Sequence, residues 1–91
     1  MIEAHLYGKL RRFTDNLDPA RDSIIYVPVN HGDTIGDIAR RIGIPEKELG
    51  PNIFLNGEYS ALTRKVKDGD RLGLFPDDMV LLYKWYFKKV T

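Results

Sequence analysis

The chain has few residues of the types that carry out chemistry. His5 and His31 are its only histidines, and neither is accompanied by further ligands at the spacing of a metal site. Cysteine is absent, which excludes thiolate nucleophiles, thiolate metal ligands and disulfides together. Ser23 and Ser60 have no evident base to activate them. We therefore expect no catalytic residues, no metal site and no cofactor, and a protein that is not an enzyme.

Acidic and glycine residues offer no stronger signal. Four aspartates flank one short apolar run, RLGLF, at its two ends: Asp68, Asp70, Asp77 and Asp78. The first two are typical turn formers, and the second two are typical of a solvated surface. Gly32 and Gly36 fit no nucleotide-binding fingerprint. The sequence therefore predicts neither a catalytic pair of carboxylates nor a phosphate loop.

Basic residues gather in short clusters, which could indicate nucleic-acid binding. The clusters are Arg11-Arg12, Arg40-Arg41, Arg64-Lys65-Lys67 and, near the end, Lys84, Lys88 and Lys89. Acids are nearly as numerous, 13 against 14 basic residues, and the net charge is +1. Because the two signs are interspersed, solvated faces explain the clusters better than a nucleic-acid-binding patch.

The segment 79–91, MVLLYKWYFKKVT, is unusually apolar and aromatic for a surface. Fully burying one large apolar side chain stabilises a protein by about 1.5–3 kcal/mol, so we expect something to cover this segment. We take its large and basic side chains as candidate partner-binding residues. They are Leu81, Tyr83, Lys84, Trp85, Tyr86, Phe87 and Lys88.

Two conformations of this segment remain open. An extended strand places Leu81, Tyr83, Trp85 and Phe87 on one face and Lys84 and Lys88 on the other, and the aromatic content favours it. A helix instead aligns Met79, Leu82, Tyr83, Tyr86 and Val90. The segment could be covered by the chain's own sheet, by another chain through strand addition or exchange, or by a membrane surface. Its modest length argues against the membrane.

One helix is clear among the elements that position these residues. In DTIGDIARRIGIP a single apolar stripe is formed by Ile35, Ile38, Ala39 and Ile42. Thr34 is the expected N-cap, with Asp37 completing a capping box. Gly43 and Pro45 end the helix near residue 42.

Short alternating runs predict strands around this helix. They are IEAHL, SIIYVPV, NIFLNGE and RLGLF. Pro28 marks an edge strand or a strand end, and Asn56-Gly57 is a strong hairpin signal. KLRRF reads as one helical turn, and 45–50 as another that is closed by Gly50. The order predicts an α+β fold: one mixed four- to five-stranded sheet with one main helix packed across it.

Length and composition fit one globular domain. The chain has 91 residues, of which 43% are hydrophobic and 30% charged. The start, MIEAHLYGKL, has no apolar run of signal-peptide length, and no stretch reaches the ~18 apolar residues of a membrane span. A cytoplasmic location is expected.

Several motifs in order resemble one known family. LYGKLRRF, GDTIGDIARRIGIP and NIFLNGEYSALTRKVKDGDRLGLFP are similar to the ubiquitin-like β-grasp sulfur carriers of molybdopterin and thiamin synthesis, the MoaD/ThiS family. The resemblance covers roughly residues 1 to 77. It implies a β-grasp domain at 1–78, followed by an extension at 79–91. A weaker similarity, limited to the GDT-helix, NG and DGD signals, links the chain to RNA-binding TGS domains.

The family's chemistry depends on a C-terminal Gly-Gly, which an activating enzyme adenylates and which is then converted to a thiocarboxylate. By resemblance, this pair should fall near Val80-Leu81, but no Gly-Gly occurs in the sequence. The first hypothesis is therefore a non-catalytic ubiquitin-like module that binds proteins through its sheet and its C-terminal segment, or that self-associates. An adenylyltransferase or a pterin enzyme is a candidate partner. The alternatives are a sulfur carrier in molybdopterin, tungstopterin or thiamin synthesis with an atypical terminus, and a TGS-like RNA- or nucleotide-binding module.

Overall fold

A computed structural model of the chain describes residues 1–14 and 23–79. The elements in these ranges are five strands, one α-helix and three short 3₁₀ turns. In order they are β1 (Ile2–Leu6), η1 (Gly8–Phe13), β2 (Ile24–Val27), α1 (Ile35–Ile42), η2 (Glu46–Glu48), β3 (Leu49–Leu55), β4 (Glu58–Tyr59), β5 (Arg71–Pro76) and η3 (Asp77–Met79).

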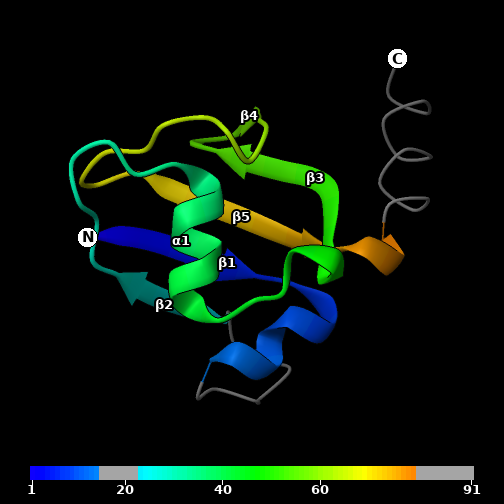
Figure 1. Ribbon diagram of the computed structural model, residues 1–91. Helices are drawn as coiled ribbons and strands as arrows, with labels where there is room; N and C mark the ends of the chain where they lie inside the picture. Colours follow the sequence, from blue (N-terminus) through cyan, green and yellow to red (C-terminus); the bar gives the residue numbers. More distant parts are fainter. Residues whose placement is uncertain (15–22, 80–91) are drawn as a thin grey trace.

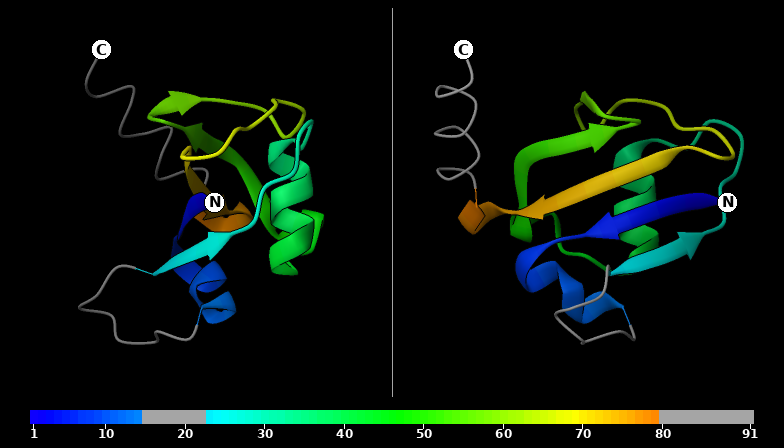
Figure 2. Two further views of the ribbon diagram at one scale, coloured as in Figure 1. Left: turned by 90° about the vertical axis from the view of Figure 1, so that its left-hand side faces the viewer. Right: turned by 180° about the vertical axis from the view of Figure 1, so that it is seen from behind.

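The strands form one mixed sheet in the order β2-β1-β5-β3-β4 (Figure 1). β1 pairs parallel with β5, so the first and last described strands are neighbours, whereas every other pair is antiparallel. Helix α1 lies across one face of the sheet, which the side view in Figure 2 shows as a two-layer arrangement. The predicted α+β fold with one mixed sheet and one main helix is confirmed.

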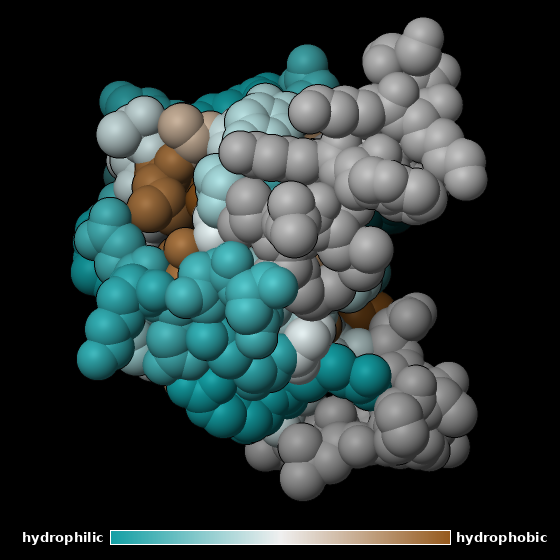
Figure 3. Space-filling model, turned by 90° about the vertical axis from the view of Figure 1, so that its right-hand side faces the viewer, coloured by the Kyte–Doolittle hydropathy of each residue, from teal (hydrophilic) through white to brown (hydrophobic). Residues whose placement is uncertain are grey.

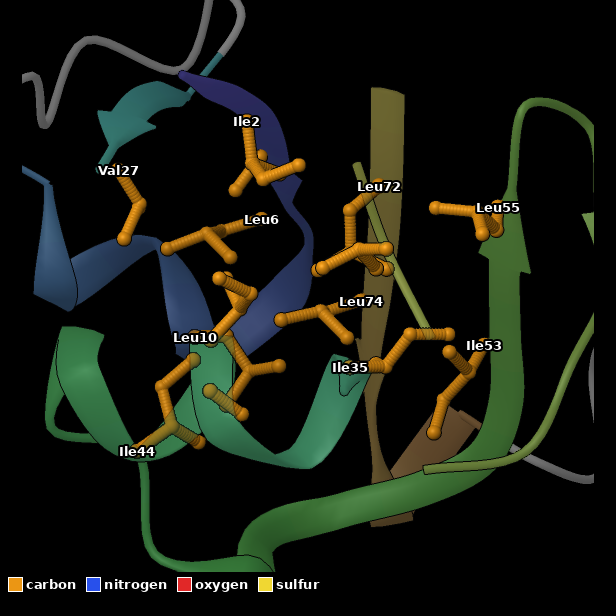
Figure 4. Close-up of a cluster of buried hydrophobic side chains, with 14 residues drawn as sticks. Ile2, Leu6, Leu10, Val27, Ile35, Ile44, Ile53, Leu55, Leu72 and Leu74 are labelled. Atoms are coloured by element: carbon orange, nitrogen blue, oxygen red, sulfur yellow. The ribbon is translucent and has the colours of Figure 1, made fainter. Parts of the chain in front are cut away.

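The hydrophobic core lies between α1 and the sheet. Strand residues alternate in direction, and the inward set is aliphatic, so that Ala4, Leu72 and Leu55 form one row across three strands. Leu6, Leu74 and Ile53 form the next row. These side chains point toward the helix in Figure 4, where they meet a buried set from outside the sheet that includes Leu10, Ile35, Ile38, Ala39 and Ile44.

Helix α1 begins and ends as its sequence predicts. The Asp37 amide donates to the Thr34 hydroxyl at 3.2 Å, and the Thr34 amide donates to the Asp37 carboxylate at 2.9 Å, which completes the capping box. At the other end Gly43 has a φ of 102°, and its amide bonds to Ala39 and Arg40 carbonyls. Ile35, Ile38 and Ala39 are buried, so the predicted stripe faces the sheet.

The N-cap gives a first testable prediction. Thr34→Ala removes the acceptor for the Asp37 amide, and we expect it to lower the free energy of unfolding by about 1 kcal/mol, measured by urea denaturation. Thr34→Ser keeps the hydroxyl and is the matched control. Equal losses in the two variants would show that the hydroxyl does not carry the effect.

The structure corrects one boundary. The sequence pattern places a helical turn at 45–50, closed by Gly50, and a strand from about residue 52. Instead η2 is limited to Glu46–Glu48, and β3 already begins at Leu49. Leu49 pairs with Pro76, and the register shifts between Leu49 and Ile53, so pairing with β5 overrides the local turn signal of Gly50.

Two predicted turn features are confirmed. Asn56 and Gly57 have φ values of 53° and 84°, as the tight turn between β3 and β4 requires. β2 lies at the edge of the sheet and stops at Val27, immediately before Pro28.

In the two described ranges, no helix is long and apolar enough to cross a membrane.

Candidate functional site: the outer face of the sheet

The sheet face opposite α1 carries mainly aromatic and polar side chains, whereas the face toward α1 is aliphatic. Pairing places His5 beside Gly73, Gly73 beside Phe54, and Phe54 beside Tyr59, so these residues form one row across four strands. On the same face, one step toward the start of β1, Glu3 lies between Tyr26 and Arg71. Among the described residues, no helix or strand covers this face (Figure 2). It is the strongest candidate for a functional surface.

Four rings on this face are in mutual contact. Tyr7 stacks on Phe75, with centroids 4.3 Å apart and planes 6° from parallel. Phe54 meets Phe75 edge-on at 6.0 Å and Tyr59 edge-on at 5.7 Å. Such contacts fix the rings in orientation, so the cluster forms a pre-shaped apolar surface. Tyr7 and Tyr59 are exposed, at 40% and 61%.

A groove with a volume of about 330 Å³ lies in this face. Its lining includes His5, Tyr7, Phe54, Arg71, Gly73 and Phe75. Figure 3 shows the molecule from the right-hand side of Figure 1, where β3 starts and η3 follows β5. Hydrophobic surface is visible there beside hydrophilic surface. A hollow between α1 and the start of β3, lined by residues that include Ile44 and Leu62, has a volume of only about 10 Å³. Because that space barely holds one water molecule, the groove is the better binding candidate.

Charged groups occupy one end of the groove. The Glu3 carboxylate lies 2.6 Å from His5 Nε2 and 3.3 Å from Arg71 Nε. Arg71 is largely exposed, whereas His5 is mostly covered. The hydrogen bond with His5, followed by the charges of His5 and Arg71, holds the pKa of Glu3 below its ordinary value. The groove thus joins an aromatic floor to an anchored ionic cluster.

The Glu3 cluster gives a second prediction. Because His5 is the main cause of the lowered pKa of Glu3, His5→Ala should raise the pKa of Glu3 toward its ordinary value, measured by carboxyl-carbon NMR during an acid titration. In the unsubstituted chain the low pKa contributes stability above the unfolded-state pKa of Glu3, and this contribution is lost as pH falls through the folded-state value. Tyr59→Ala, outside the cluster, should leave the Glu3 titration unchanged. An unaltered Glu3 titration in His5→Ala would contradict the assignment.

The structure separates the other chemically capable residues. His31 lies in the loop between β2 and α1, away from the groove. The Ser23 hydroxyl accepts from Arg11, and the Ser60 hydroxyl donates to the Glu58 carbonyl, so both serines have structural partners. Within residues 1–14 and 23–79, no three His, Cys, Asp or Glu side chains gather as a metal site.

The aspartates behave as turn formers and surface groups. Asp70 is buried and accepts from the Lys67 amide at 2.9 Å and from Asn56 Nδ2 at 3.0 Å. Asp77 is exposed and pairs with Lys9 at 2.7 Å, and hydrogen bonding to Lys9 lowers the pKa of Asp77. The predicted roles of Asp70 and Asp77 are confirmed.

Most arginines of the basic clusters pair with acids. Arg12 contacts Glu48, Arg40 contacts Asp37, Arg41 contacts Asp33 at 2.8 Å and Arg64 contacts Glu58 at 2.8 Å. Such pairing supports interpreting these clusters as surface ion pairs. The predicted partner-binding residues, from Leu81 to Lys88, lie outside the described residues.

The groove itself was not anticipated from the sequence, but a signal for it exists. Phe54 stands between Ile53 and Leu55, and Phe75 stands between Leu74 and Pro76. In each strand the buried neighbours identify the aromatic as the residue on the outer face. An outward phenylalanine on two neighbouring strands indicates a surface with a partner.

Comparisons with known proteins agree with this architecture. Residues 1–81 match the family model described as Mut7-C ubiquitin. A crystal structure of SAMP1 from Haloferax volcanii superposes with a TM-score of 0.61 and 23% identity, covering 82% of this chain and 92% of that one. A crystal structure of H. volcanii small archaeal modifier protein 1 gives a TM-score of 0.61 and 24% identity, over 82% and 94%. No curated protein matches.

At these identities the structural likeness shows the fold alone. It confirms the predicted ubiquitin-like β-grasp, with its mixed sheet and single main helix. The division of the chain at residues 78 and 79 stays a prediction.

Proposed function

The chain belongs to the Mut7-C ubiquitin family, and from this premise we propose that it is a non-catalytic protein-binding module. Its binding surface is the outer face of the sheet, centred on the groove at Gly73, together with the segment that follows η3. Binding takes place through apolar and ionic contacts, without covalent chemistry.

The observation that carries this proposal is the aromatic groove. Aromatic side chains and arginine dominate the binding energy of protein interfaces, because the rings bury much apolar area and the guanidinium forms charge-assisted hydrogen bonds. Tyr7, Phe54 and Phe75 supply the apolar part, and Arg71 supplies an exposed guanidinium beside it. A partner that inserts an apolar side chain over Gly73 would reach all of these groups at once.

The C-terminal segment extends the proposed surface. Its candidate contacts are Leu81, Tyr83, Trp85, Tyr86 and Phe87, with Lys84 and Lys88 adding positive charge. This composition suits a partner with an apolar patch bordered by acids. The fold's resemblance to sulfur carriers makes an adenylyltransferase or a pterin enzyme a reasonable class of partner, and self-association is the alternative.

Site-specific photo-crosslinking tests the proposal. A benzophenone amino acid at Tyr59, on the outer face, should crosslink to a partner protein in cells that produce the chain naturally. The same probe at the exposed Lys47, on η2, is the control. Phe54→Ala should reduce the crosslink at Tyr59. Crosslinks of equal yield at both positions, or at Lys47 alone, would reject the outer face as the binding surface.

A sulfur-carrier role is the second candidate, and the resemblance of the motifs in residues 1–77 to the MoaD/ThiS sulfur carriers supports it. Residues 1–91 contain no Gly-Gly, the pair that the activating chemistry requires, and this favours the binding module. Incubation with ATP and an activating enzyme, followed by intact-mass measurement, decides between the two. An adenylate or a thiocarboxylate on the chain would favour the carrier, and an unchanged mass favours the binding module.

RNA binding in the TGS manner is less well supported, because the arginines at positions 12, 40, 41 and 64 are engaged by acids. A titration with RNA at two salt concentrations tests this role. Binding through phosphates would weaken steeply as salt rises, and the absence of any binding would exclude it.

A further inference from the structure

We propose that the outer edge of β2, the side of the strand that faces away from β1, pairs with the same edge of a second copy of this chain. The two strands run antiparallel, with Ile25 of each copy at the centre, so that the two sheets continue into one. This surface is not the groove of the outer face, and the inference does not depend on the proposed function.

The two edges of the sheet, β2 and β4, differ in how they are protected (Figure 1). Edge strands are commonly kept from pairing with other chains by short length and by charged side chains. β4 has both kinds of protection, because it consists of two residues and one of them is Glu58. β2 is longer, its residues IIYV are all apolar or aromatic, and no charged side chain occurs from Ser23 to Val29. Of the two edges, β2 is therefore the one open to pairing.

The backbone groups that point outward from β2 follow from its pairing with β1. The Leu6 amide donates to the Ser23 carbonyl at 2.9 Å, which identifies these two residues as a hydrogen-bonded pair. Such pairs alternate along an antiparallel ladder, so Ile25 also bonds to β1, whereas Ile24 and Tyr26 do not. The N–H and C=O groups of Ile24 and Tyr26 therefore point away from β1, and no strand within residues 1–14 and 23–79 pairs with them.

These outward groups select one symmetric register. The ladder cannot extend past the end of β2, because Pro28 has no N–H and its carbonyl accepts from Arg41 at 2.8 Å. When Ile24 of each copy pairs with Tyr26 of the other, both pairs exchange their N–H···O bonds, and the two Ile25 residues face each other on the two-fold axis. A register shifted by two residues in either direction would instead leave Ile24 or Tyr26 opposite a residue outside β2.

The side chains of the edge also suit a second copy. The Tyr26 ring is 60% exposed on the outer face, and in this register it lies against Ile24 of the second copy. An aromatic residue opposite a β-branched one is a favourable cross-strand pair, and the two-fold axis forms it twice. Because the edge carries no charge, two copies bring no like charges together. Hydrogen bonds, apolar contacts and charge therefore all permit self-pairing.

The pairing has a consequence for the groove. Since the two-fold axis is perpendicular to the continuous sheet, the outer faces of both copies lie on the same side. The dimer would present two grooves in one direction, and a partner with two binding segments would gain affinity from both.

Amide hydrogen exchange, followed by NMR on the full chain, tests the pairing without any substitution. The contact is small, so we expect a weak dimer whose population rises with protein concentration, measured in parallel by sedimentation equilibrium. At the concentration where half of the chains are paired, the amides of Ile24 and Tyr26 should exchange about twofold more slowly than in dilute solution, because they exchange only from the free chain. The Ile25 amide bonds to β1 and should exchange slowly at every concentration.

Three results of this experiment would overturn the inference. Slow exchange of Ile24 and Tyr26 at every concentration would show that the chain covers its own edge. Rapid exchange at every concentration, with no dimer up to about 1 mM, would show that the edge stays unpaired. Slowing that appears only when cell extract is added would assign the edge to a different protein.

Single cysteines test the register. Because the chain has no cysteine, Ile25→Cys and Tyr26→Cys each introduce one thiol. In the proposed dimer the two copies of residue 25 lie opposite each other with Cα atoms about 4.5 Å apart, whereas the two copies of residue 26 are diagonal neighbours about 7–8 Å apart. A disulfide needs Cα atoms within about 7 Å, so in a glutathione buffer Ile25→Cys should form linked dimers faster, although residue 26 is the more exposed. Equal or faster linkage through Tyr26→Cys would overturn the inference.

A proline at the edge provides a third readout. Ile24→Pro removes an outward N–H without removing a bond to β1, so the fold should be kept and the dimer lost. Ile24→Val keeps the N–H and the β-branched shape, and it is the matched control. A folded Ile24→Pro chain that pairs as strongly as Ile24→Val contradicts the inference. The partner crosslink at Tyr59, on β4 at the other edge, is judged separately and bears on the proposed function.

Discussion

Replacing Leu74 by alanine is expected to lower the free energy of unfolding by about 3 kcal/mol, within the 2–5 kcal/mol typical of buried leucines. Leu74 is fully buried in β5, the middle strand of the sheet, and lies between Leu6 on β1 and Ile53 on β3. Since all three strands hold its surroundings in place, the cavity left by alanine cannot collapse easily. Both the lost burial and the empty space then destabilise the fold.

The consequence is large for a chain of this size. A 91-residue domain has a free energy of unfolding of about 5–14 kcal/mol, so the substitution removes a large share. The midpoint of thermal unfolding should fall by about 12–24 °C, measured by calorimetry. Leu74→Met keeps the volume and should lose less than about 1.5 kcal/mol. If Leu74→Ala lowered the free energy of unfolding no more than Leu74→Met does, Leu74 would not belong to the tightly packed core.

A second large effect is expected at Asp70. Its carboxylate binds the Lys67 amide in its own turn and Asn56 Nδ2 in the β3–β4 hairpin turn. Asn56 in turn accepts from the Arg71 amide at 2.9 Å, so one buried acid connects two turns at the same end of the sheet. Asp70→Ala leaves two donors without an acceptor, and we expect a loss of about 2–3 kcal/mol in urea denaturation.

The neighbouring Asp68 supplies the control for this experiment. It lies in the same turn but is exposed, and it pairs only with the N-terminal amine among the described residues. Asp68→Ala should therefore change stability little. Comparable losses at Asp68 and Asp70 would show that the turn needs its negative charge and not the hydrogen bonds of Asp70.

Local chemistry made much of the fold predictable. The capping box of Thr34 and Asp37 and the left-handed Gly43 define α1 because each depends on residues only a few positions away. The same holds for Asn56-Gly57, whose positive φ values are a property of the residue types themselves. The family resemblance then identified the fold as a β-grasp, which such short-range signals do not specify.

Features that depend on distant residues could not be predicted in the same way. The start of β3 at Leu49 is set by its pairing with Pro76, which overrides the turn chemistry of Gly50. The groove arises because Tyr7 follows β1, Phe54 lies in β3 and Phe75 lies in β5, and these segments meet only after the sheet has formed. The role of Gly73 in the groove could not be predicted either. The sequence RLGLF alone does not distinguish a glycine that lines a surface groove from one that forms a turn.

The parallel pairing of β1 with β5 also has a consequence for synthesis on the ribosome. Ile2–Leu6 is made early, but its partner Arg71–Pro76 is made only after all the other strands. A growing chain therefore cannot complete the middle of its sheet until residue 76 has emerged. Until then the apolar side chains of β1 lack their neighbours on β5 and stay in a partly folded chain. A fold that depends on contacts between such distant residues forms slowly, and its partly folded states expose apolar surface to other molecules. The nascent chain is thus most vulnerable to aggregation just before β5 arrives.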